Sequence, residues 1–90
     1  MSRFKGKVAL ITGGALGIGG ATARRLAIEG ATIIIADVNP DAATDNVQSI
    51  LEAGGIASAI NVDVAVPNDI KSMIEHVEEK WHKLDILVQN

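Results

Sequence analysis

The chain has 90 residues and a formal net charge of −3, and it contains no cysteine and no tyrosine. This length fits one domain at most, and the scattered Lys and Arg residues form no basic run that would bind nucleic acid. The lack of cysteine excludes disulfides and cysteine-ligated metal sites and fits a reducing compartment. No apolar stretch approaches the roughly 20 residues of a membrane span, and the first residues lack the apolar segment of a signal peptide. We therefore expect a cytoplasmic protein that binds neither nucleic acid nor membranes.

Four short apolar runs recur along the chain, and none of them alternates polar with apolar residues. Continuous runs of this length predict strands that are buried on both faces, as in parallel sheets. The runs occupy residues 8–11, 33–36, 59–62 and 86–88.

Three helical patterns separate these runs. The first follows a glycine cluster and ends near Gly30, and the second stops at the glycine pair 54–55. The third begins at Pro67, where the missing N–H does no harm. The residues that define the patterns are Ile18, Thr22, Ala23 and Leu26, then Ala43, Val47, Ile50 and Leu51, then Ile70, Met73, Ile74, Val77 and Trp81.

Strands that alternate with helices at this spacing predict an α/β fold with a doubly wound parallel sheet. With right-handed crossovers and the strand order 3-2-1-4, the first two helices cover one face and the third covers the other. The fourth strand is then an apolar edge, which invites aggregation. We therefore expect residues 1–90 to be the N-terminal part of a single larger domain and to self-associate when expressed alone.

Five glycines lie between Gly13 and Gly20, after a predicted strand and at the start of a predicted helix. The first N–H groups of a helix have no intrahelical partner and carry partial positive charge, so they form a phosphate site when no Cβ blocks the approach. Gly13 would turn the chain out of the strand, Gly17 would admit phosphate, and Gly19 would let the helix pack on the sheet. A tight turn with close packing and no ligand is the alternative.

The stretch TGGALGIG, residues 12–19, resembles the cofactor motif of the short-chain dehydrogenase/reductase family, and the resemblance continues in register over essentially the whole chain. The family transfers hydride between a nicotinamide cofactor and an alcohol or carbonyl group. The resemblance therefore implies an NAD(P)-binding, Rossmann-type domain and a small-molecule alcohol or ketone substrate. It also implies that the backbone N–H of Ile18 contacts the pyrophosphate and that Leu16 lies over the cofactor. Gly20 departs from the family, which often has a charged or larger residue there.

Asp37 ends the second apolar run, eighteen positions after Gly19. In a βαβ nucleotide site, a carboxylate about 20 residues beyond the glycines accepts hydrogen bonds from ribose hydroxyls. The same charge repels a 2′-phosphate, and no Lys or Arg is close to it in sequence. We therefore predict that NAD is preferred over NADP. The alternative is that Asp37 caps the second helix, although Asn39 and Asp41 lie closer to its start.

Three more residues are assigned by the resemblance. It implies that Asp63 and Val64 contact the adenine, whereas the alternative is that Asp63 caps the third helix. Asn90 matches the second Asn of the family's Asn-Asn-Ala-Gly motif, which contacts the cofactor ribose or braces the central strands. Gln89 departs from the first Asn of that motif.

The family's catalytic residues are a Ser, a Tyr and a Lys four positions after that Tyr. Because the chain has no tyrosine, we assign no catalytic residue, and we predict no metal site. Two hypotheses remain open: the cofactor-binding portion of an NAD-dependent oxidoreductase, whose family members are usually dimers or tetramers, or a truncated, non-catalytic nucleotide-binding module. A third is another doubly wound fold, such as a methyltransferase.

Overall fold

The computed structural model describes residues 3–63 and 66–89. Within these ranges no helix has both the length and the apolar character needed to cross a membrane. The elements alternate as predicted and confirm the α/β class. In chain order they are β1 (Val8–Thr12), α1 (Gly17–Ile28), β2 (Thr32–Asp37), α2 (Pro40–Glu52), β3 (Ile56–Asn61), α3 (Pro67–Trp81) and β4 (Ile86–Val88).

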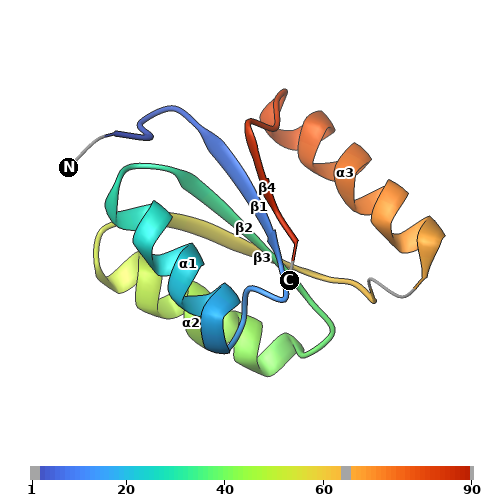
Figure 1. Ribbon diagram of the computed structural model, residues 1–90, viewed down its shortest axis with the longest axis horizontal. Helices are drawn as coiled ribbons and strands as arrows, with labels where there is room; N and C mark the ends of the chain where they lie inside the picture. The colour runs from blue at the N-terminus through green and yellow to red at the C-terminus, as the bar shows by residue number, and fades with distance from the viewer. Residues whose placement is uncertain (1–2, 64–65, 90) are drawn as a thin grey trace.

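The strands form one parallel sheet in the order β3-β2-β1-β4, which confirms the predicted topology. Figure 1 shows α1 and α2 on one side of the sheet and α3 on the other. Because the strands are parallel, their carboxyl ends lie at the same edge of the sheet. The strand order reverses at β1, which has β2 on one side and β4 on the other. In doubly wound sheets, ligands bind at the carboxyl ends beside this reversal.

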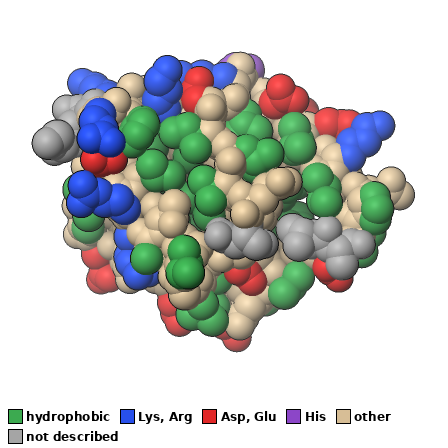
Figure 2. Space-filling model, in the orientation of Figure 1, with side chains coloured by type: hydrophobic (Ala, Val, Ile, Leu, Met, Phe, Trp, Pro, Cys, Tyr) green, Lys and Arg blue, Asp and Glu red, His purple; other side chains and the backbone are tan. Residues whose placement is uncertain are grey.

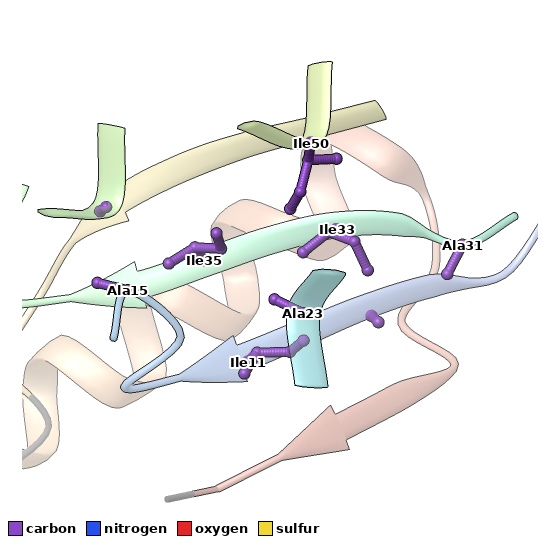
Figure 3. Close-up of a cluster of buried hydrophobic side chains, with 9 residues drawn as sticks. Ile11, Ala15, Ala23, Ala31, Ile33, Ile35 and Ile50 are labelled. Carbon is purple, nitrogen blue, oxygen red and sulfur yellow. The ribbon is translucent and has the colours of Figure 1, made fainter. Parts of the chain in front are cut away.

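The inner strands β1 and β2 are buried on both faces because their side chains alternate between two hydrophobic clusters. Ile11, Ile33 and Ile35 pack with Ala23 of α1 and Ile50 of α2 (Figure 3). The cluster on the opposite face consists of Val8, Leu10, Ile34, Ala36, Val62, Met73 and Val77. This two-sided burial explains why both strands are continuous apolar runs in the sequence.

The prediction that all four runs are buried on both faces is wrong for the outer strands β3 and β4. Neither strand contains a fully buried residue: in the predicted runs Ala59 is exposed and Leu87 is 44% exposed, although Val62, just after β3, is buried. An outer strand has a neighbour on one side only, so fewer atoms cover its side chains. Figure 2 shows hydrophobic side chains gathered across the middle of the face where Figure 1 places β4. β3 also begins at Ile56, three residues before the expected run.

Two residues of the predicted helical patterns, Ile18 and Leu51, are exposed instead of packed, and Ile18 is 82% exposed. The buried residues of α1 are Gly19, Gly20 and Ala23. Successive helical residues are turned by about 100°, so Ile18 lies outside the face that these three residues form. Small residues on that face let α1 approach the sheet closely.

β4 is attached to β1 through a carboxylate at its amino end. Asp85 Oδ2 accepts a hydrogen bond from the Val8 backbone N–H at 2.8 Å and lies 3.3 Å from Lys83 Nζ. The Val8 bond, with help from the Lys83 ammonium, holds the pKa of Asp85 below its ordinary value of 3.8, against the opposing effect of burial. At the other end of the pair, Thr12 Oγ1 donates to the Val88 carbonyl at 3.4 Å.

This contact predicts a pH dependence of stability. The folded pKa of Asp85 lies below that of the unfolded chain, so its ionised carboxylate stabilises the fold above about pH 3.8, and this contribution is lost as the pH falls through the folded pKa. In Asp85→Asn, the urea midpoint of unfolding should therefore decrease less than in the wild type when the pH is lowered from 6 to 3. Glu75→Gln, at an exposed carboxylate paired with Lys71 at 4.0 Å, is the control. Identical pH profiles for Asp85→Asn and the wild type would contradict the assignment.

Candidate functional site

The loop between β1 and α1 leaves the sheet through a sharp backbone turn. Gly13 has φ +65° and Gly17 has φ +60°, the left-handed region in which glycine is favoured. The Gly13 N–H donates to the Ala36 carbonyl at 2.8 Å, so the loop remains attached to β2 at its first residue. Gly13 therefore turns the chain out of the strand, as predicted from its place in the motif.

The amino end of α1 carries no compensating side chain. Its N-cap residue is Leu16, which makes no side-chain cap hydrogen bond, and its first turn contains no acidic residue. By contrast, α2 is capped by Asn39, whose Oδ1 accepts from the Ala42 N–H at 3.0 Å. Of the helices in the described ranges, α1 alone lacks an acid in its first turn. A helix start without a side-chain cap or an acid would favour an anion beside its first N–H groups.

The glycines of the loop serve two different purposes. A Cβ on Gly14 would lie 3.0 Å from the Ile11 carbonyl oxygen and 3.2 Å from Ile35 Cγ2, and one on Gly20 would lie 3.1 Å from the Ala15 carbonyl oxygen. These two glycines therefore allow close packing, which accounts for Gly20. A Cβ on Gly17 would meet no atom within 4 Å, so the space over the helix start is open.

Asp37 connects the end of β2 to this loop. Its Oδ2 accepts from the Ala15 N–H at 3.2 Å, and its Oδ1 accepts from the Asn39 N–H at 2.9 Å. Asn39 is the N-cap of α2, so the alternative in which Asp37 caps that helix is wrong. A carboxylate accepts about four hydrogen bonds, so both oxygens keep capacity for further donors.

Asp63 lies beside Asp37 at the same edge of the sheet. The Val62 N–H donates to the Asp37 carbonyl at 3.1 Å, which places the residue after it near the end of β2. Asp63 is exposed, and its backbone N–H donates to Asp69 Oδ2 at 3.2 Å. The N-cap of α3 is Val66, with no side-chain cap, so Asp63 does not cap α3. Val64 and Asn90, the other two predicted contacts, lie outside the described residues.

One buried polar residue near the loop was missed from the sequence. Asn46 of α2 is 4% exposed, and its Nδ2 donates to the Gly14 carbonyl at 2.7 Å. Its signal in the sequence is its position, since it lies three residues after Ala43 and four before Ile50 on the buried side of α2. A polar residue inside an apolar stripe indicates a specific partner.

A glycine loop that opens an uncapped helix at the strand-order reversal of a parallel sheet, with a carboxylate at the end of the neighbouring strand, defines a Rossmann-type nucleotide-binding fold. Residues 7–90 match the sequence model of the family described as short chain dehydrogenase, and the chain belongs to this family.

Its relatives are oxidoreductases. The chain is 40% identical over 90 residues to the uncharacterized oxidoreductase YxbG of Bacillus subtilis (strain 168), covering 100% of this chain and 33% of that protein. The crystal structure of hydroxysteroid dehydrogenase from Escherichia coli matches with a TM-score of 0.94 and 38% identity over 98% of this chain and 37% of that one. The chain thus spans about a third of the length of the relatives it matches.

Similar structures contain either nicotinamide dinucleotide. Carveol dehydrogenase from Mycobacterium avium, in complex with NAD, matches with a TM-score of 0.90 and 31% identity over 100% of this chain and 37% of that one. A metagenomic short-chain oxidoreductase in complex with NADP matches with a TM-score of 0.93 and 29% identity over 96% and 39% of the two chains.

The packing at Gly14 predicts a cost for the smallest side chain. Gly14→Ala should destabilise the fold by about 1–3 kcal/mol, because its Cβ would press on Ile11 and Ile35, both fully buried. Chemical denaturation measures this, with the exposed Thr44→Ala as control. In the absence of the clash, Gly→Ala would instead stabilise by about 0.4–1 kcal/mol, so unchanged or increased stability would refute the packing argument.

Proposed function

We propose that this chain is the cofactor-binding part of an NAD-dependent oxidoreductase that transfers hydride between the nicotinamide and an alcohol or carbonyl group of a small molecule. The observation that carries the proposal is the hydrogen bond between the Asp37 carboxylate and the Ala15 N–H, 3.2 Å long, which holds a carboxylate beside an uncapped helix start. The proposed cofactor-binding residues are Gly13, Leu16, Gly17, Ile18, Gly19, Asp37, Asp63, Val64 and Asn90.

The pyrophosphate would bind at the amino end of α1. The open space over Gly17 is one that a Cβ would fill, and the exposed Ile18 and Leu16 flank it without contributing charge. Backbone N–H groups and the helix dipole favour an anion there. These features fit a diphosphate, and the bound nicotinamide would supply the hydride acceptor or donor.

The ribose would be selected by Asp37. Its two backbone hydrogen bonds fix the carboxylate, and the free lone pairs are left for ribose hydroxyls. Over residues 3–63 and 66–89, no Lys or Arg nitrogen lies within 4.0 Å of it to offset its charge against a 2′-phosphate. This supports NAD over NADP. Asp63, at the neighbouring strand end, would accept from the adenine amino group.

The rest of the enzyme would lie beyond these residues. The proposed organisation is a single NAD(P)-binding domain whose N-terminal part is residues 1–90, with the catalytic Ser, Tyr and Lys in the remainder. The names of similar proteins, hydroxysteroid dehydrogenase and carveol dehydrogenase, favour a secondary alcohol or ketone as the substrate class. We place the complete protein in the cytoplasm as a homodimer or homotetramer without nucleic-acid or membrane partners.

The second candidate is a non-catalytic nucleotide-binding module, which the same uncapped helix start and Asp37 carboxylate would equally serve. Both candidates bind the dinucleotide, but only the first oxidises alcohols or reduces ketones. Steady-state assays of the full-length protein with a panel of secondary alcohols and NAD separate the two. Binding without turnover on every substrate would favour the module.

Replacing Asp37 tests the cofactor assignment. Asp37→Ala in the full-length protein should raise the Kd of NAD about 10- to 100-fold, because a hydrogen bond to a charged acceptor contributes about 1.5–3 kcal/mol. The same change removes the repulsion of a 2′-phosphate and should therefore reduce the difference between the Kd values of NAD and NADP. Calorimetric titration with both dinucleotides measures this, and Asp41→Asn, an exposed acid in the first turn of α2, is the matched control. A ratio that does not change in Asp37→Ala would reject the ribose assignment.

A further inference from the structure

The buried amide of Asn46 joins α2 to three points of the glycine loop and α1. Its Nδ2 donates to the Gly14 carbonyl at 2.7 Å and to the Gly20 carbonyl at 3.4 Å, and its Oδ1 accepts from Arg24 Nη1 at 3.0 Å. The Arg24 contact fixes which side of the amide is the acceptor, so the NH₂ group faces the two carbonyls. These three partners of the Asn46 side chain therefore belong to the loop or to the first two turns of α1.

One peptide group is held from both sides by this arrangement. The Gly14 carbonyl and the Ala15 N–H belong to the same planar trans peptide and point in opposite directions. The carbonyl accepts from Asn46 Nδ2 at 2.7 Å, and the N–H donates to Asp37 Oδ2 at 3.2 Å. Rotation of this peptide would break both hydrogen bonds, so its orientation links α2 to the Asp37 carboxylate.

We propose that Asn46 is a positioning residue of the dinucleotide site, which fixes the Gly14–Ala15 peptide and, through its N–H, the orientation of the Asp37 carboxylate toward the ribose. This inference rests on the proposed function, because the site it serves is the proposed NAD site. Asn46 itself lies behind the loop and acts only through the peptide.

Gly20 belongs to the same arrangement. A Cβ at this position would lie 3.1 Å from the Ala15 carbonyl oxygen and 3.5 Å from Arg24 Nη1. The missing side chain therefore leaves room for the loop to lie against α1, whereas the contact with the guanidinium would be an ordinary van der Waals contact. This gives a reason for glycine where the family pattern often has a larger residue.

The buried amide of Asn46 lies among apolar residues on the inner side of α2. Burial of a polar side chain is unfavourable unless it is hydrogen-bonded, and the neighbouring buried positions of α2, Ala43 and Ile50, are apolar. An apolar side chain at 46 would fill the space but would leave the Gly14 carbonyl without its donor. Control of the loop peptide accounts for the amide.

A double-mutant cycle in the full-length protein tests the role. Asn46→Leu should raise the Kd of NAD about tenfold, measured by calorimetry, and should reduce the difference between the Kd values of NAD and NADP. In the Asp37→Ala background the same substitution should raise the Kd by no more than about twofold, because the carboxylate that the peptide orients is gone. Ile50→Val, a buried change on α2 that touches no loop carbonyl, should lower the Tm but leave the Kd of NAD unchanged.

Three results overturn the inference: an unchanged Kd in Asn46→Leu, equal effects of that substitution with and without Asp37, or a similar loss of binding in Ile50→Val. If Asn46→Leu fails to fold, Asn46→Asp replaces it, since the carboxylate retains the size and the Arg24 contact but not the donor. Failure of the wild-type protein to bind either dinucleotide overturns the proposed function itself. If the wild-type protein binds NAD but the effects of Asn46→Leu and Asp37→Ala on the binding free energy simply add, only the role of Asn46 is overturned.

Discussion

The close approach of α1 to the ends of β1 and β2 is the constraint on which the rest of the structure depends. Gly14 and Gly20 permit it, because a Cβ at either would meet backbone oxygen at 3.0–3.1 Å. Once the loop lies against β2, the Ala15 N–H reaches the Asp37 carboxylate and the helix start opens over Gly17. Packing and ligand recognition therefore have the same origin in missing side chains.

Much of the fold and of the candidate site could be predicted from the sequence, because the relevant signals are local or periodic. Two-sided burial of β1 and β2 follows from their continuous apolar runs, and Asn39 lies at the start of α2, nearer to it than Asp37, as expected. Edge strands are harder, since Ile56 is exposed, Ala57 and Ser58 are only half-buried, and the start of β3 shows no long apolar run. The prediction that Ile18 belongs to the packed face of the first helix is wrong, although an apolar residue in an amphipathic segment is ordinarily packed.

The Gly14–Ala15 peptide shows why the remainder could not be predicted. Asn46 lies 32 residues from Gly14, and its partners are carbonyl oxygens, which every residue carries. A contact of this kind has no complementary residue type to search for in the sequence. Only the folded arrangement of α2 behind the loop brings the amide and the peptide together. Asp37, by contrast, was identifiable because nucleotide sites require a charged group at that spacing.

The alternating burial of β1 and β2 also limits how such a chain can change in length over evolution. Adding one residue within either strand would exchange its two hydrophobic faces, so Ile33 and Ile35 would trade places with Ile34. The connections at the carboxyl ends are fixed as well, since they carry the glycine loop and Asp37. Gain or loss of residues is therefore best tolerated at the opposite rim, where α2 leads into β3 and α3 into β4.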